Sequence, residues 1–182
     1  KSGETLVLLQ SSAGLSAVVP KTGKVVWTFG DGASTIPSST AVGDTVYVPS
    51  NGVTALQPQA KGDPKVAWKS SRLSPSTSSP LIYQGRVFTV NRAGALTAAD
   101  AKTGDVVWQM RLKGPFTSTP VAAGGLLYFF NEKGLGQVVK PGEKAGELVG
   151  SSPLDETILC SPGVAGNALY VRSDGHLWKI AK

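Results

Sequence analysis

The chain has 182 residues, of which 16% are charged, and its 22 glycines and 12 prolines make it rich in turns. This composition excludes a disordered chain and predicts a folded all-β protein. The formal net charge is +6, but the lysines and arginines are dispersed without a basic run, which argues against nucleic-acid binding. No apolar run approaches the ~20 residues of a membrane helix, so no membrane span is predicted.

The first strand is predicted at residues 4–9, and the unit that it opens supplies about three strands, the last ending at Trp27. Each later unit opens with a hydroxyl residue, which in three cases stands directly before a proline. These openings fall 40, 40 and 42 residues apart, at Ser39, Ser79, Thr119 and Ser161. Regular spacing of this kind indicates an internal repeat.

Further strands are predicted after each opening, three in the complete units and two after Ser161. An alternating strand follows a glycine turn, at residues 45–48, 86–90, 126–129 and 168–171. A third strand follows another glycine, at residues 53–56, 95–98, 135–138 and 176–178. The fourth strand contains a tryptophan, and the three copies are spaced by 41 and 40 residues, at Trp27, Trp68 and Trp108. A further step of 40 falls on Leu148, which we expect to occupy the same apolar slot.

Four short strands every ~40 residues, joined by Gly, Asn and Asp turns, are typical of a β-propeller. Each blade is a small twisted sheet with two apolar faces, and it is stable only when neighbouring blades cover them. We therefore predict an all-β fold, a single partial or half propeller over residues 1–182 with blades of four antiparallel strands. The repeat units are expected at residues 1–36, 37–76, 77–116, 117–158 and 159–182.

Residues 98–108 follow the pattern A-x-D-x-x-x-G-x-x-x-W. This resembles the tryptophan-docking motif of PQQ-like (quinoprotein-type) repeats, which form the blades of quinoprotein dehydrogenases and of a bacterial propeller lipoprotein of outer-membrane assembly. The resemblance implies that the tryptophans lie between blades, while the aspartate and the glycine shape the turn. The structural docking residues are then Trp27, Trp68, Trp108, Asp100 and Gly104.

The other copies of the motif are eroded. Unit one has Val19 in place of the aspartate, and unit two has Gln57 there and a longer turn through residues 62–64. Unit four retains little beyond Leu148. The resemblance nevertheless covers the whole chain, and it implies an extracytoplasmic protein, periplasmic or secreted. We expect this chain to be the C-terminal half of a larger propeller.

The resemblance also raises the question of a cofactor. It implies, for the dehydrogenases, a Ca²⁺ ion held by carboxylate and amide side chains and often a disulfide of adjacent cysteines against the quinone. This chain has one cysteine, Cys160, one histidine, His176, and no D-x-D-x-D-G calcium loop. We therefore predict no cofactor, no catalytic metal and no enzymatic activity, with Cys160 as a buried structural residue.

A few charged residues remain as candidates for contacts. Four arginines and His176 would hold an anionic ligand at the channel or one rim, or else they cap strand ends and the edge of a hairpin turn. The pair Asp155-Glu156 is either a proton-transfer pair or a solvated loop before a strand. The four arginines are Arg72, Arg92, Arg111 and Arg172.

The function predicted from these observations is non-catalytic binding or scaffolding, with rim loops that contact an unidentified protein partner. The alternative is a sensor or enzyme-associated propeller that binds a quinone-like or anionic small molecule. The two terminal units, of about three strands each, would overfill a single shared blade. We therefore expect a fragment of a longer protein or, in preference, a homodimer that completes the propeller.

Overall fold

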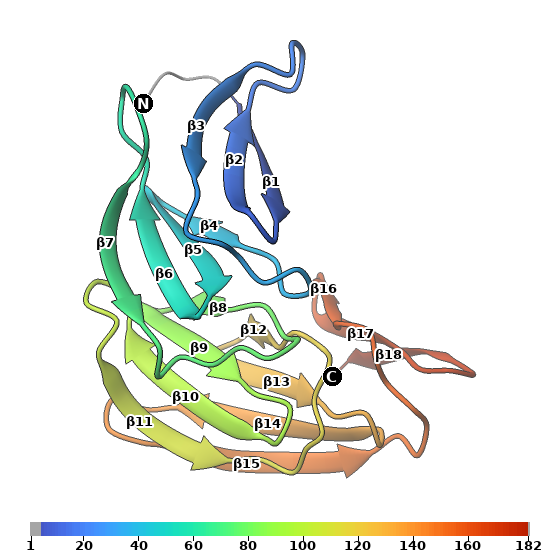
Figure 1. Ribbon diagram of the computed structural model, residues 1–182. Helices are drawn as coiled ribbons and strands as arrows, with labels where there is room; N and C mark the ends of the chain where they lie inside the picture. Colours follow the sequence, from blue (N-terminus) through green and yellow to red (C-terminus); the bar gives the residue numbers. More distant parts are fainter. Residues whose placement is uncertain (1–4, 182) are drawn as a thin grey trace.

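The computed structural model describes residues 5–181. They form eighteen strands in five antiparallel sheets, which follow one another around an arc in chain order (Figure 1). The predicted all-β fold of successive blades, a partial propeller, is therefore confirmed. Within the described residues, no helix has the length and hydropathy of a membrane span.

Each sheet, here called a blade, is a meander in which strands adjacent in sequence are adjacent in the sheet. Blade 1 contains β1 (Val7–Ser11), β2 (Gly14–Val18) and β3 (Val25–Phe29). Blade 2 contains β4 (Thr40–Val42), β5 (Thr45–Ser50), β6 (Gly52–Gln57) and β7 (Lys65–Ser70). Blade 3 contains β8 (Leu81–Tyr83), β9 (Arg86–Val90), β10 (Ala95–Asp100) and β11 (Val106–Arg111).

The last two blades continue the same order. Blade 4 contains β12 (Val121–Ala123), β13 (Leu126–Phe130), β14 (Leu135–Pro141) and β15 (Gly146–Pro153). Blade 5 contains β16 (Gly163–Ala165), β17 (Ala168–Arg172) and β18 (Leu177–Ala181). In the four-stranded blades the first strand has three residues, and the first strands of blades 2 to 5 contact one another in turn.

The middle strands of a blade are buried on both faces. Four consecutive residues are buried in β9 and again in β10. In a strand with one face exposed to solvent, buried and exposed residues would alternate instead. The fourth strand differs, because Trp68 is the only buried residue of β7. Apolar runs in the middle of each repeat are therefore explained by cover from the two neighbouring blades.

A β-bulge recurs at the same point of the third and fourth strands. It follows the pairs Ala17–Trp27, Ala55–Trp68 and Ala98–Trp108, so the three tryptophans are equivalent. In blade 4 the bulge follows the pair Val138–Gly150 instead. The expectation that Leu148 occupies the tryptophan slot is therefore wrong, because Leu148 takes the place of Val106 and Gly150 that of Trp108.

The hydrophobic core is divided into one cluster for each pair of neighbouring blades. The largest lies between blades 3 and 4 and includes Phe88, Trp108, Phe116 and Phe129. Separate clusters lie between blades 2 and 3 and between blades 1 and 2. The cluster between blades 4 and 5 has three buried members, Phe130, Ile158 and Val171. Each blade is thus stabilised chiefly by its nearest neighbours.

Candidate functional site

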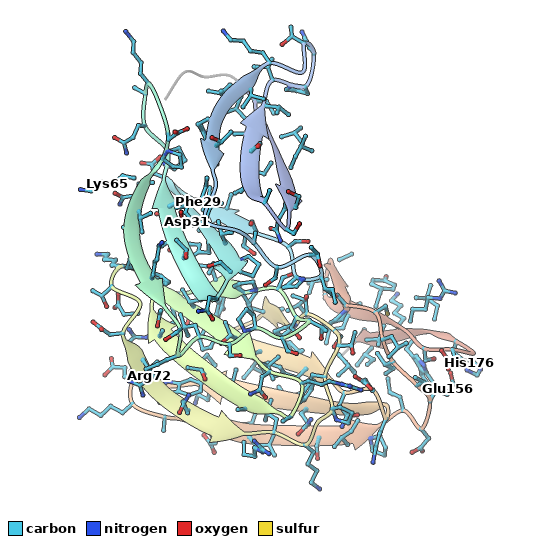
Figure 2. The ribbon with its side chains drawn as sticks, viewed as in Figure 1. Phe29, Asp31, Lys65, Arg72, Glu156 and His176 are labelled. Carbon is cyan, nitrogen blue, oxygen red and sulfur yellow. The ribbon has the colours of Figure 1, made fainter. Side chains whose placement is uncertain are left out.

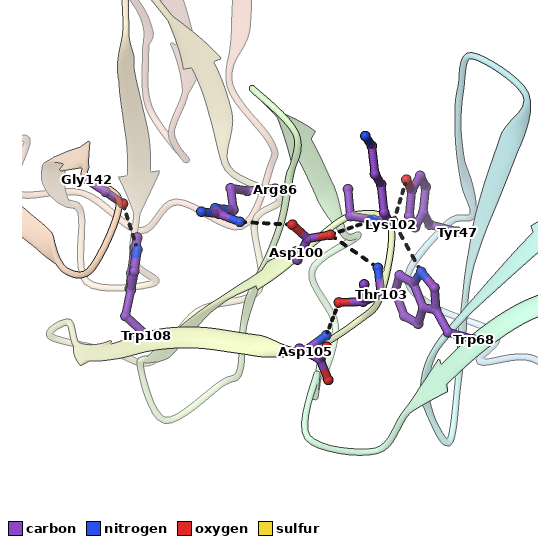
Figure 3. A network of polar contacts seen from close by, with 10 residues as sticks. Tyr47, Trp68, Arg86, Asp100, Lys102, Thr103, Asp105, Trp108 and Gly142 are labelled. Atoms are coloured by element: carbon purple, nitrogen blue, oxygen red, sulfur yellow. Dashed lines mark hydrogen bonds and ion pairs between the residues drawn. The ribbon is translucent and has the colours of Figure 1, made fainter.

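The interface between blades 2 and 3 is built around Trp68. Its indole N–H donates to the carbonyl of Ala101, 3.1 Å away, and the Tyr47 hydroxyl donates to the same oxygen (Figure 3). Gly104 lies under the ring, where a Cβ atom would come within 2.5 Å of the indole. Its φ of +76° also favours glycine, so the turn approaches Trp68 as no larger residue would allow.

Asp100 shapes that turn. Its Oδ1 accepts hydrogen bonds from the amides of Lys102 and Thr103, at 2.8 and 3.2 Å. Its Oδ2 pairs with the Arg86 guanidinium at 3.2 Å, and the Thr103 hydroxyl accepts from the amide of Asp105. The carboxylate therefore replaces the backbone partners that the turn amides lack, as in an Asx-turn (Figure 3). The turn that it stabilises contains Ala101, whose carbonyl accepts from Trp68.

Trp108 makes the equivalent contact with blade 4. Its indole N–H donates to the carbonyl of Gly142 at 2.9 Å, and a Cβ atom on Gly146 would lie 2.8 Å from the ring. Trp27 is also buried, with 4% of its surface exposed. Its indole N–H, however, has no hydrogen-bond partner among residues 5–181.

A row of hydroxyl contacts joins the inner edges of blades 2 to 5, and its role was not recognised in the sequence. The amide of Ser38 donates to the Ser79 hydroxyl, the amide of Ser79 to Thr119, and the amide of Thr119 to Ser161, each at 2.9 Å. The three accepting residues, Ser79, Thr119 and Ser161, are among those that mark the openings of the repeat units. A signal for this contact was therefore present, but it gave only the phase of the repeat.

The four candidate arginines do not form one site. Arg92 pairs with Glu132 across blades 3 and 4 at 3.1 Å. Arg111 and Arg172 stand at the ends of β11 and β17, and Arg72 lies in the turn after β7. In the part of the chain that the structure describes, no ion pair or hydrogen bond joins Arg72, Arg111 or Arg172 to an acid through its guanidinium.

His176 lies on the opposite side of the arc from Arg72 (Figure 2). Its Nδ1 contacts the Glu156 carboxylate, which also accepts from the Ser173 hydroxyl at 2.5 Å and the Gly175 amide at 3.0 Å. The Ser173 hydrogen bond, with those of Gly175 and His176, holds the pKa of Glu156 below its usual range. The carboxylate thus anchors the β17–β18 hairpin to the loop from blade 4.

This cluster does not have the geometry of a serine hydrolase. In a Ser–His–acid site the imidazole lies between the hydroxyl and the carboxylate and accepts the proton of the nucleophile. Here the carboxylate of Glu156 lies between Ser173 and His176, and the Ser173 oxygen accepts from the Trp178 indole. The arrangement binds a turn and does not activate a hydroxyl.

The structure also bears on Cys160 and on the calcium ion that the resemblance implies. Cys160 is only partly buried, and its thiol donates to the carbonyl of Arg172, so the expectation of a buried cysteine is wrong. No three His, Cys, Asp or Glu side chains gather around one point in residues 5–181. This donor set does not fit the Ca²⁺ that the quinoprotein resemblance implies, because that ion takes six to eight oxygen ligands.

Comparison with known proteins agrees with this geometry. The model of a family described as outer membrane protein assembly factor BamB matches residues 52–141. The crystal structure of BamB from Moraxella catarrhalis has a TM-score of 0.72 at 18% identity, over 93% of this chain and 54% of that chain. No significant match is found among curated protein sequences.

Dehydrogenase propellers have the same fold. Quinohemoprotein alcohol dehydrogenase from Comamonas testosteroni has a TM-score of 0.73 at 13% identity, over 97% of this chain and 40% of that chain. A europium-containing methanol dehydrogenase has a TM-score of 0.51 at 20% identity, over 63% of this chain and 24% of that chain. The fold and its contacts therefore define a β-propeller of quinoprotein-type repeats.

Within that class, residues 52–141 are similar to the BamB family, and the chain shares the propeller fold of the BamB structure. It spans about half the length of the BamB structure that it matches, and a smaller share of the dehydrogenases. It is therefore a partial propeller.

Proposed function

We propose that this chain is a non-catalytic binding or scaffolding part of an extracytoplasmic propeller, and that its binding surface is the rim over blades 3 and 4. The observation that supports this is a rigid loop, residues 112–118, which presents the exposed Lys113 beside further exposed cations of blades 3 and 4. Preorganised loops on a stable scaffold are the usual place for protein recognition. The description of the family, outer membrane protein assembly factor, fits a protein that acts by binding.

The loop is held by two buried amide side chains. Gln137, 2% exposed, accepts a hydrogen bond from the amide of Lys113 and donates to its carbonyl, each at 2.9 Å. Asn131, also 2% exposed, donates to the same carbonyl at 2.8 Å. Because the Lys113 backbone is fixed on both sides, little conformational entropy remains to be lost on binding.

Exposed cations outnumber the acids on this rim, where Asp155 lies against the β13–β14 turn that carries Glu132. Arg92 is 63% exposed and pairs with Glu132, whose pKa is held below its usual range by hydrogen bonds from Thr117 and Arg92. The amide of Glu132 donates to the carbonyl of Pro115, which places the loop of residues 112–118 beside the β13–β14 turn. The exposed cations of this surface, here called the basic rim, are Arg92, Arg111, Lys113 and Lys133. The partner that it fits is an acidic protein segment.

Charge reversal tests the basic rim. The variant Lys113→Glu/Lys133→Glu should bind a synthetic acidic peptide about tenfold more weakly than the wild type, measured by fluorescence anisotropy at two salt concentrations. The matched control is Lys140→Glu/Lys144→Glu, which reverses two exposed charges near the β14–β15 turn. Equal affinity of the wild type and the rim variant would overturn the basic rim as the binding surface.

Catalysis is tested separately. We propose that the protein has no quinone-dependent activity, since the described residues offer no clustered acidic donors for calcium. The protein is incubated with PQQ and Ca²⁺ and assayed for dye-linked alcohol oxidation against a heat-denatured control. Turnover above that control would contradict the proposal, whatever the result with the acidic peptide.

A further inference from the structure

The interface between blades 1 and 2 lacks a contact that its two neighbours have. Trp68 and Trp108 donate to carbonyl oxygens of the next blade, whereas the Trp27 indole N–H has no such acceptor in residues 5–181. Among residues 5–181, the Thr89 hydroxyl is the fully buried side-chain polar atom that lacks a hydrogen-bond partner. The Trp27 nitrogen does not belong to this class of fully buried atoms. That nitrogen therefore faces space that solvent can reach.

The cause is the turn of blade 2 that faces Trp27. Trp68 lies thirteen positions after its cross-strand partner Ala55, whereas Trp27 lies ten positions after Ala17. The turn before Trp68 is thus three residues longer than that of blade 1. Asp63 near its end accepts from the amide of Thr28 at 2.9 Å, so this turn is held to β3 through Thr28, and among residues 5–181 it supplies no carbonyl to the indole N–H.

A cleft of about 1100 Å³ opens between β3 and this turn. Trp27, Val46 and Leu6 contribute to its lining, and so do two adjacent valines of β3, Val25 and Val26. The valines are 52% and 42% exposed, so they present apolar surface to the cleft. The bulge explains their joint exposure, because Val26 has no cross-strand partner while Val25 and Trp27 have one each.

The charged groups of the lining are two lysines and one carboxylate. Lys24 directly precedes β3 and Lys61 lies in the long turn, and both are exposed. Asp44 is the carboxylate. The cleft thus combines apolar walls, an N–H donor without a partner and an excess of positive charge. A ligand that fits must have an apolar body and an anionic oxygen acceptor.

We propose that this cleft binds an amphipathic carboxylate, such as a medium-chain fatty acid. The carboxylate accepts from the Trp27 indole N–H, in the place of the carbonyl that a docking turn supplies to Trp68. Lys24 and Lys61 neutralise its charge, and the alkyl chain lies against Val25 and Val26. The site is distinct from the basic rim, so either proposal stands or falls without the other.

Calorimetric titration with dodecanoate, below its critical micelle concentration, tests the site. The wild type should show saturable binding at a stoichiometry of one. Lys24→Gln/Lys61→Gln should weaken it about tenfold, and Trp27→Phe, which keeps the ring and removes the N–H, about fivefold. Lys144→Gln, an exposed lysine outside the cleft, should leave binding unchanged.

Dodecyltrimethylammonium provides the second arm, because it has the same chain with the opposite charge. Equal binding of the two amphiphiles, or equal binding of dodecanoate to the wild type and the double lysine variant, would overturn the proposal, as would no saturable binding at all. Circular dichroism melts check that Trp27→Phe is folded. If it is not, the double lysine variant decides, since both of its positions are exposed.

Discussion

Trp108 is the single side chain whose loss should destabilise the fold most clearly. It packs against Phe88 with ring centroids 5.9 Å apart, donates to Gly142 and is 6% exposed. Trp108→Ala should lower the free energy of unfolding by about 3–5 kcal/mol, measured by urea denaturation, because it opens a cavity and leaves a carbonyl unpaired. Val149→Ala, at a position 46% exposed, is the control. A loss under ~1 kcal/mol for Trp108→Ala would show that the indole contributes little to the interface.

The two carboxylates that bind inter-blade loops predict how stability depends on pH. Hydrogen bonds from Thr117 to Glu132 and from Ser173 to Glu156 lower both pKa values in the folded state. The folded state therefore binds fewer protons than the unfolded state near pH 4.5, and this stabilisation is present above that pH and lost as the pH falls through the folded pKa values. Urea melts at pH 7 and pH 3 should show a smaller loss for Glu132→Gln/Glu156→Gln than for the wild type. Equal losses would contradict this origin.

At the scale of the turn, two glycines separate backbone strain from close packing. Gly104 and Gly62 have almost the same φ, +76° and +77°, but a Cβ atom would clash with Trp68 only at Gly104. Gly62→Ala should cost about 1–2 kcal/mol for the left-handed backbone, and Gly104→Ala about 1–3 kcal/mol more, because the ring must move. Thermal melts compare the two variants. Equal destabilisation would mean that the turn shifts freely under the indole.

The strands could be predicted because their signals are local. Glycine turns and apolar alternation lie within a few residues, and the hydroxyl markers repeat with the inner strands. The error at Leu148 has a physical reason: Gly150 lies twelve positions after Val138, whereas Trp108 lies ten after Ala98. A constant step of 40 residues along the chain takes no account of this longer turn. The pairing of strands within the sheet does, because it aligns Gly150 with Trp108.

The contacts of the candidate sites were not predictable in the same way. Arg92 and Glu132 come from different blades, and Glu156 reaches His176 across a loop and a hairpin. Such pairs depend on where each blade places its turn, which the repeat period does not specify. The clasp of Gln137 on the Lys113 backbone is of the same kind. The cleft beside Trp27 had a local signal in the sequence, the long turn of unit two. That this turn opens a cleft could be recognised only once blade 1 was placed beside it.

At the scale of the whole molecule, the blades at the two ends of the arc expose apolar surface. Val7 and Leu9 of blade 1 are 41% and 55% exposed, and Leu177 and Ile180 of blade 5 are 71% and 41% exposed. In the interior of the arc, equivalent faces are covered by the next blade. Apolar faces of this kind are covered in stable propellers, and pairing of two copies about a two-fold axis covers both at once.

We therefore expect this chain to form a homodimer that brings the terminal blades of two copies together. Light scattering at micromolar concentration should give the dimer mass, and the melting temperature should rise with protein concentration, because dissociation accompanies unfolding. Leu9→Lys/Leu177→Lys should give a monomer, since charges on both faces oppose burial, whereas Val149→Lys on the outer strand of blade 4 should leave the dimer intact. A wild-type monomer whose melting temperature does not change with concentration would refute the pairing. The apolar end faces of the arc would then have to tolerate water or be covered by blades of a longer chain.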